Sequence, residues 1–277
     1  MRQGFADLGY VEGRNLVIEY RFGDDRLERV PELTAELLRL PVDLIVAQGS
    51  AVSEISKLGV SIPIVYIFSG DPISAGLAES LSRPRGNMTG LTLMAAELNS
   101  KRLEILRDIV TDLRRVAIVA NPEHDGVNLE RANCEETGQH LGVDIRYYPT
   151  PTRDTLDAAF AAMAADRPQA ISIFSDGFAV QNRRRIIDFA NDQRMPVIAA
   201  WSIFARSGAV CSYGPRISEP YRRLADYVDR ISKGAKATEL PIERPTRFEM
   251  VINLTAAKAL GLSIPPALLA SADEVIE

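Results

Sequence analysis

The chain has 277 residues, enough for two hydrophobic cores, and its 46% apolar and 25% charged residues are typical of a globular protein. Its 32 basic and 37 acidic residues give a net charge of −5, which argues against binding nucleic acid by neutralising phosphates. The one local exception, the basic cluster 182–185, falls in a predicted helix, and we interpret it as a solvated face.

The two cysteines and two histidines do not have the spacing of a metal site. Cys134 falls in a helical pattern and Cys211 in a strand pattern, so we expect two buried thiols, no metal and no cofactor. No run of about 18 apolar residues predicts a membrane span. Residues 1–13 lack the apolar core of a secretory signal, so we expect no signal peptide in the sequence as it stands.

Strand and helix patterns alternate along almost the whole chain. Short β-branched runs predict strands at 15–21, 42–47, 62–68, 88–93, 115–120, 143–149, 170–175, 196–201, 209–214 and 247–253. Helical periodicity predicts helices at 1–9, 28–40, 50–58, 72–82, 96–110, 126–141, 154–166, 179–193, 218–233 and 255–261. This alternation is typical of α/β proteins with doubly wound parallel sheets, covered by helices on both faces.

Two interruptions of the pattern predict two such lobes. A polar stretch at 111–115 precedes a strand that restarts the alternation, and a second break falls at 206–208. We therefore expect lobe one to comprise 1–113 and about 207–245, and lobe two to comprise 115–206 and about 246–277.

Polar, glycine and aromatic residues follow the predicted strands. Ligands of doubly wound sheets bind at the carboxyl ends of the strands. The candidate ligand-binding residues at these ends are Gln48, Gly49, Ser50, Ala51, Ser69, Gly70, Asp71, Asn121, Asp176, Trp201 and Tyr213.

Each candidate also has an ordinary structural explanation. Ser50 and Asp71 suit helix N-caps, Asp71 because Pro72 favours a first helical position, and Asn121 and Asp176 suit turns. Taken together, however, helix N-termini after residues 49 and 70 suit a carboxylate, and the two aspartates suit an ammonium group.

Aromatic residues near the strand ends suit a ring or an apolar slot. Trp201, Tyr213 and Tyr66 could line it. The sequence has no GxGxxG, GxxxxGK[ST], GxSxG or HExxH motif, and we expect His124 and His140 to be solvated rather than catalytic. The pattern therefore predicts the binding of a small zwitterion and no catalysis.

Three long motifs carry a resemblance to a known family. They are RPRGNMTGL at 83–91, YRRLADYVDRISKGAK at 221–236 and RFEMVINLTAAKALGLSIPPALLASADEVIE at 247–277. Over residues 1–277 the chain resembles the substrate-binding component of ABC-type uptake systems, in the group labelled tryptophan/tyrosine transport-like.

The resemblance implies a periplasmic-binding-protein fold of the first type. Its two lobes are joined by three crossings and a hinge, and the strand-end residues above face the cleft between them. It also implies a monomer that binds a small amino-acid-like or aromatic carboxylate and delivers it to an ABC permease in the membrane. The expected location is periplasmic, or extracellular and lipid-anchored.

One departure from the family concerns the start of lobe one. Members have an apolar strand before the helix that corresponds to 1–9, so we expect the first strand of lobe one to be missing here, as in a shortened gene model. The alternative function is a ligand-sensing regulator or an enzyme built on the same two lobes. A regulator would need a DNA-binding segment, and an enzyme a nucleophile–base pair at the cleft.

Overall fold

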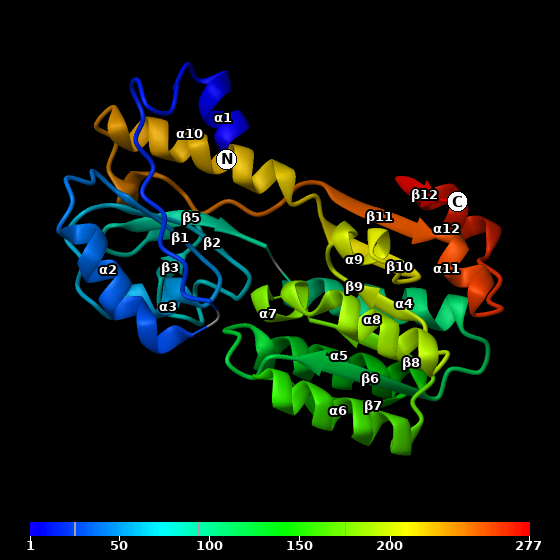
Figure 1. Cartoon of the computed structure of the whole chain (residues 1–277). Helices are drawn as coiled ribbons and strands as arrows, with labels where there is room; N and C mark the ends of the chain where they lie inside the picture. The colour runs from blue at the N-terminus through cyan, green and yellow to red at the C-terminus, as the bar shows by residue number, and fades with distance from the viewer. Residues whose placement is uncertain (25, 94, 175) are drawn as a thin grey trace. The chain divides into compact units, whose positions relative to one another are not determined.

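The computed structural model describes residues 1–24, 26–93, 95–174 and 176–277 (Figure 1). The chain forms two compact units. Unit 1 comprises residues 1–94 and 217–245, and unit 2 comprises residues 95–216 and 246–277. The chain therefore passes between the units three times, as the family resemblance implies.

Unit 1 is built on a small parallel sheet of β1 (Ile45–Gln48), β2 (Ile64–Phe68) and β5 (Met88–Thr92), in the order β1-β2-β5. Helices α2 (Val30–Leu38) and α3 (Ala51–Ser56) share a core with one face of this sheet. Helix α10 (Ser218–Ser232) packs on β2 and β5, and α1 (Arg2–Asp7) packs on α10 (Figure 1). The short elements of the unit are η1 (Leu27–Arg29), η2 (Ala237–Glu239) and the hairpin of β3 (Ala78–Ser80) and β4 (Arg83–Pro84).

Strand β2 is the centre of this core. Every one of its five residues is buried, as its apolar sequence predicts for a strand covered on both faces. Tyr66 lies within it with no exposed surface, and burial raises the pKa of its phenol. The expectation that Tyr66 could stack on a ligand ring is therefore wrong, because its ring belongs to the core.

The predicted strand at 15–21 does not form. Within this segment only Leu16 takes part in a β-bridge, to Glu12, and Val17 and Tyr20 are 79% and 41% exposed. Among the described residues β1 pairs with β2 alone, so segment 15–21 does not extend the sheet at the outer edge of β1.

The predicted helix at 72–82 is also wrong. The chain makes turns from Pro72 to Gly76, whose φ of 75° is left-handed, and then enters strand β3. The glycine ends the turn because it adopts this conformation without the strain of a Cβ atom. Residues 78–80 then pair with β4 in an antiparallel hairpin, so they are not available to a helix.

Unit 2 contains a seven-stranded sheet in the order β12-β11-β10-β9-β8-β6-β7. Its strands are β6 (Arg115–Ala120), β7 (Asp144–Pro149), β8 (Ala170–Ile173), β9 (Val197–Ala199), β10 (Cys211–Pro215), β11 (Phe248–Asn253) and β12 (Glu274–Ile276). Neighbouring strands are parallel except β10 and β11, so β6 to β10 form the predicted parallel sheet and β11 and β12 run the other way.

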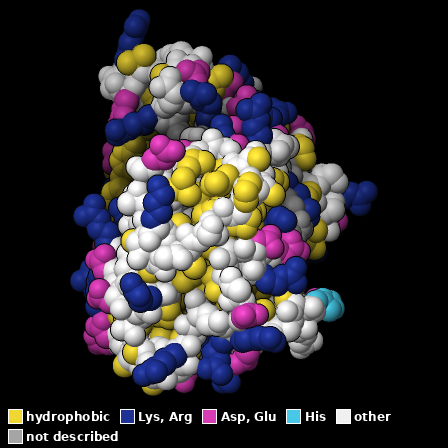
Figure 2. Space-filling model, turned by 90° about the vertical axis from the view of Figure 1, so that its right-hand side faces the viewer, with side chains coloured by type: hydrophobic (Ala, Val, Ile, Leu, Met, Phe, Trp, Pro, Cys, Tyr) yellow, Lys and Arg dark blue, Asp and Glu magenta, His cyan; other side chains and the backbone are white. Residues whose placement is uncertain are grey.

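Helices cover both faces of this sheet, as the double winding predicts (Figure 1). One core takes residues from α4 (Ala95–Ile109), α5 (Val127–Leu141), α11 (Leu254–Ala259) and α12 (Pro266–Ser271). The other takes residues from α6 (Arg153–Asp166), α7 (Gly177–Gln181), α8 (Arg183–Asp192) and α9 (Ser202–Arg206). Figure 2, turned to the side on which the chain ends, shows hydrophobic side chains gathered on part of that face.

The boundaries of the two compact units can be set beside those of the predicted lobes. The units divide at 94/95, 216/217 and 245/246, and the lobes predicted from the sequence divide near 113, 206 and 245. Helix α4 belongs to unit 2 because it packs on α5 and β10, and β10 belongs there because it pairs with β9 and β11. Ser175, the last residue of the strand predicted at 170–175, lies outside the described residues.

The cysteines and the basic cluster are where the sequence predicts them. Cys134 on α5 and Cys211 on β10 are free and buried, and burial raises the pKa of each thiol to about 12. Arg184 and Arg185 are exposed on α8. None of the described helices is long and apolar enough to cross a membrane.

Candidate functional site

In unit 1 the carboxyl ends of β1, β2 and β5 lie at one edge of the sheet. Gln48 pairs in register with Ile67, and the Gly49 amide donates to the Ile67 carbonyl over 3.1 Å. On the next strand, the Thr92 hydroxyl donates to the Gly70 carbonyl over 3.0 Å. The carboxyl ends of β1, β2 and β5 are thus joined, and the residues that this brings together are Gln48, Gly49, Ser50, Ala51, Ser69, Gly70 and Asp71.

The end of β1 offers main-chain groups more than side chains. Gly49 has a φ of 60°, which favours glycine, and leads directly into α3. Ser50 is the N-cap residue of α3, but its side chain makes no capping hydrogen bond, unlike the predicted cap. The exposed Gln48 side chain accepts a hydrogen bond from the Tyr221 hydroxyl of α10 over 2.7 Å.

Asp71 holds the turn that follows β2. Its Oδ1 accepts from the Ile73 amide over 3.1 Å, and its Oδ2 accepts from the Ser74 amide over 3.3 Å and the Ser74 hydroxyl over 2.6 Å. Partial burial by itself raises the pKa of Asp71, but these hydrogen bonds and the charge of Arg244 together lower it. Asp71 is therefore ionised and caps a turn, although no helix begins at Pro72.

In unit 2 two polar strand ends are neighbours. Asn121 follows β6 and Asp176 follows β8, and these strands are paired with Val119 opposite Ile173. Asn121 closes its own turn, because its Oδ1 accepts from the Glu123 amide over 3.0 Å. Asp176 caps α7 by accepting from the Ala179 amide over 2.7 Å, and it is only partly exposed.

The two aromatic candidates lie on the neighbouring strands. Trp201 follows β9, is partly exposed and packs against the core shared with α6 to α9. Tyr213 lies within β10 rather than at its end, and its ring packs against the opposite core and near Phe248, with the ring centroids 6.4 Å apart. The sheet therefore separates the two rings onto opposite faces, so they cannot stack on one ligand ring together.

A buried polar cluster under the carboxyl ends of these strands was missed by sequence reasoning. It consists of Asn99 and Arg102 on α4, His124 in the loop after β6, and Glu130 on α5. Their side chains are buried, and His124 is only 4% exposed, so the expectation of a solvated histidine is wrong. His140, at the end of α5, is exposed as expected.

The sequence spacing on the two helices indicates that this cluster is buried. Asn99, Arg102 and Leu106 follow one another at three and four residues on α4, and Arg102 is therefore on the stripe of core leucines. On α5, Glu130 lies on the stripe of Val127 and Cys134 in the same way. A charged residue at an apolar position of a helical pattern indicates a buried, paired charge.

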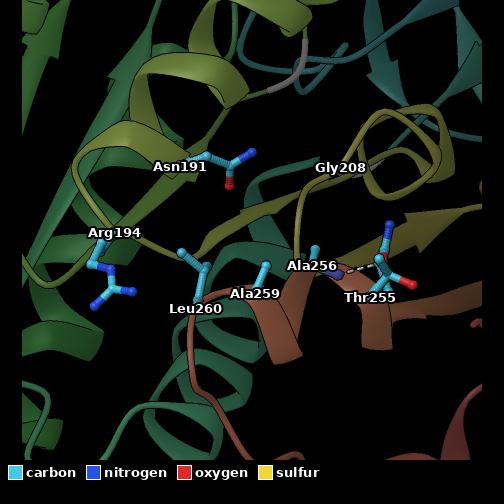
Figure 3. A pocket seen from close by; sticks show the side chains of 8 residues that line it. Asn191, Arg194, Gly208, Thr255, Ala256, Ala259 and Leu260 are labelled. Atoms are coloured by element: carbon cyan, nitrogen blue, oxygen red, sulfur yellow. Dashed lines mark hydrogen bonds between the residues drawn. The ribbon is translucent and has the colours of Figure 1, made fainter.

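One pocket of about 340 Å³ lies elsewhere in unit 2 (Figure 3). Asn191 and Arg194, at the end of α8 and in the turn before β9, face α11 across it, and Gly208 precedes β10. It is thus at the amino ends of the parallel strands, and none of the predicted strand-end residues lines it. The described residues contain no group of three or more His, Cys, Asp or Glu side chains arranged to hold a metal ion.

The comparisons with known proteins agree with this architecture. The chain is 19% identical over 261 residues to the tyrosine-binding protein of Clostridioides difficile strain R20291, covering 94% of this chain and 75% of that protein. A solved conserved domain protein from Vibrio cholerae O1 biovar El Tor superposes with a TM-score of 0.92 at 24% identity, covering 99% of this chain and 92% of that one.

A third relative was solved with an amino acid bound. It is an ABC domain from Streptococcus pneumoniae in complex with L-Trp, with a TM-score of 0.91, 18% identity and coverage of 99% of this chain and 92% of that chain. These likenesses establish a periplasmic-binding-protein-like fold. The profile of one family matches residues 1–276, and the chain belongs to that family, the ABC transporter substrate binding proteins.

Proposed function

We propose that this protein is the solute-binding component of an ABC-type uptake system and that its solute is a small amino-acid-like or aromatic carboxylate. The observation that carries the proposal is the set of groups at the carboxyl strand ends, above all the partly exposed, acidic Asp176 beside Asn121. Family membership supports a small-molecule ligand and an ABC transporter partner. The family is extracytoplasmic, and we infer that this protein also works outside the cytoplasm.

The strand ends offer a partner for each part of an amino acid. Asp176 suits the ammonium group, since a charge-assisted hydrogen bond is stronger than a neutral one. Main-chain amides at Ser50 and Ala51, at the start of α3, suit the carboxylate. Trp201 offers a partly exposed ring face to the side chain.

Asp71 is the weaker candidate for the ammonium group. Three hydrogen bonds from its own turn already use its two carboxylate oxygens. We infer that Asp71 shapes the loop that presents Ser69 and Gly70. The names of the relatives favour an aromatic side chain, since one is a tyrosine-binding protein and one was solved with L-Trp.

A series of analogues tests the proposal by calorimetry. L-Trp and L-Tyr should bind, tryptamine should bind weakly because it lacks the carboxylate, and indole-3-propionate should bind weakly because it lacks the ammonium group. The difference in affinity between L-Trp and alanine measures the contribution of the aromatic ring. Binding of neither aromatic amino acid would contradict the proposed solute class, and equal binding of tryptamine would contradict the carboxylate site.

The variant Asp176→Asn tests the role of Asp176. Asparagine keeps a cap acceptor for Ala179 but removes the charge, so stability should change little while the affinity for L-Trp falls. The loss should be ~1.5–3 kcal/mol, about 10- to 150-fold. Asp188→Asn, the same change at an exposed site on α8, is the matched control and should leave the affinity unchanged.

A further inference from the structure

The buried polar cluster of unit 2 contacts two of the segments that carry candidate-site residues. Arg102 Nε donates to the carbonyl of Tyr213 over 3.0 Å, and Arg102 Nη1 donates to Asn99 Oδ1. Glu130 Oε2 lies 3.4 Å from His124 Nε2. The cluster therefore reaches from α4 and α5 to β10 and to the loop after β6.

The backbone of His124 belongs to the loop that begins at Asn121. The His124 amide donates to the Asn121 carbonyl over 3.1 Å, and the His124 carbonyl accepts from the Val127 amide over 2.9 Å. A shift of the imidazole toward or away from Glu130 is therefore passed directly to Asn121. Asp176, which starts α7 beside this loop, is close enough to interact electrostatically with the same imidazole.

Burial makes the charges of this cluster interdependent. Glu130 and His124 are 1% and 4% exposed, and a carboxylate removed from water in this way needs a cationic partner. His124, 3.4 Å away, and the buried Arg102, which interacts with Glu130 electrostatically, are cationic groups that can balance this charge. When His124 loses its proton, the 3.4 Å contact between Glu130 and the imidazole is no longer a contact between opposite charges, and Glu130 still interacts electrostatically with Arg102.

The ionisable groups around His124 favour its protonated form. Burial by itself lowers the pKa of His124, but Glu130 on α5, Asp176 at the start of α7 and Asp125 in its own loop together raise it above 6.5. Arg102 on α4 interacts electrostatically with Glu130. The protonated form is therefore favoured and is lost as the pH rises through the raised pKa.

We propose that protonated His124 and Arg102, joined by Glu130, form a positioning cluster that holds Asn121, Asp176 and Tyr213 in their solute-binding arrangement, so that solute affinity falls when His124 is deprotonated. The link to solute rests on the proposed function. The positioning itself does not, and it is measurable in the ligand-free protein. By linkage, bound solute raises the pKa of His124, and one pKa unit corresponds to an about tenfold change in affinity.

Nuclear magnetic resonance of the ligand-free protein tests the positioning. The chain has two histidines, so His140→Asn leaves the His124 imidazole as the only histidine signal. We expect His124 to titrate above pH 6.5 and the amide signals of Asn121 and Asp176 to move with the same midpoint. A lower midpoint, or amide signals that do not follow it, would overturn the proposal whether or not any amino acid binds.

Calorimetry between pH 5.5 and 9 tests the effect on solute. The affinity for L-Trp should fall about tenfold as the pH passes the His124 midpoint, and in His124→Gln it should be low and independent of pH over this range. A wild-type affinity that stays flat while His124 titrates would overturn the proposal, as would the same pH slope in His124→Gln. Glu130→Gln, nearly isosteric, should lower the His124 midpoint and move the affinity profile with it.

Discussion

Replacing Asp71 with alanine should destabilise unit 1 without a comparable loss of solute affinity. The side chain accepts two main-chain hydrogen bonds and one from the Ser74 hydroxyl, at 2.6 to 3.3 Å. Each is worth about 0.5–1.5 kcal/mol net in general, and Asp71 is only partly buried, so we expect a total loss of ~1–2 kcal/mol. Asp43→Ala, at an exposed site before β1, is the matched control and should be close to neutral.

The pH dependence of this loss follows from the pKa of Asp71. Its pKa in the folded protein is below the ordinary 3.8, so its stabilising contribution is present above that value and is lost as the pH falls through the folded pKa. The difference between wild type and Asp71→Ala should therefore be the same at pH 7 and pH 5 and shrink in more acidic solution.

Urea unfolding followed by circular dichroism measures this difference, and fluorescence of the single tryptophan, Trp201, reports on unit 2 separately. A stability equal to wild type at pH 7 would refute the turn-capping role. A fall in L-Trp affinity of more than tenfold with unchanged stability would return Asp71 to the ammonium site.

Further predictions concern the two cores. Gly90→Ala should destabilise unit 1 by ~3 kcal/mol or more, because the new Cβ would lie 2.1 Å from the Tyr66 carbonyl oxygen and force the strands apart. The control is Gly86→Ala, where no atom lies within 4 Å of the new Cβ, and it should cost about 1 kcal/mol because the φ of Gly86 is left-handed. Thermal unfolding measures both losses of stability. Cys134 and Cys211 should not react with a thiol reagent at pH 8 until the protein is denatured, since burial raises both pKa values to about 12; fast labelling of the native protein would contradict their burial.

Most of the fold could be predicted from the sequence because the signals are local. Strand β6 forms at the residues predicted, and α5 and α10 begin and end within one residue of the prediction. These segments have long periodic patterns or uninterrupted β-branched runs, and their neighbours are present to cover them. The parallel sheets then follow from the order of strands and helices.

The failures occur where a local signal depends on a distant partner. The segment 15–21 has the composition of a strand but does not pair with the sheet, where β1 bonds only to β2 among the described residues. Asp71 and Pro72 have the cap and proline of a helix start, but the chain turns at the left-handed Gly76 and then forms the β3–β4 hairpin. Neither outcome is encoded in a window of ten residues.

The two aspartates show the same limit at the candidate site. Asp71 and Asp176 each follow a buried strand, and strand order alone places each at the carboxyl edge of its sheet. Asp71 is occupied by its own turn, whereas Asp176 lies near His124, a residue 52 positions away that the sequence pattern suggests is solvated. Topology therefore predicts where ligand-binding groups gather, but their roles depend on contacts between distant segments. Because the His124 and Glu130 charges are buried at the same edge, removing one of them should change the solute affinity of unit 2 even though neither side chain reaches its surface.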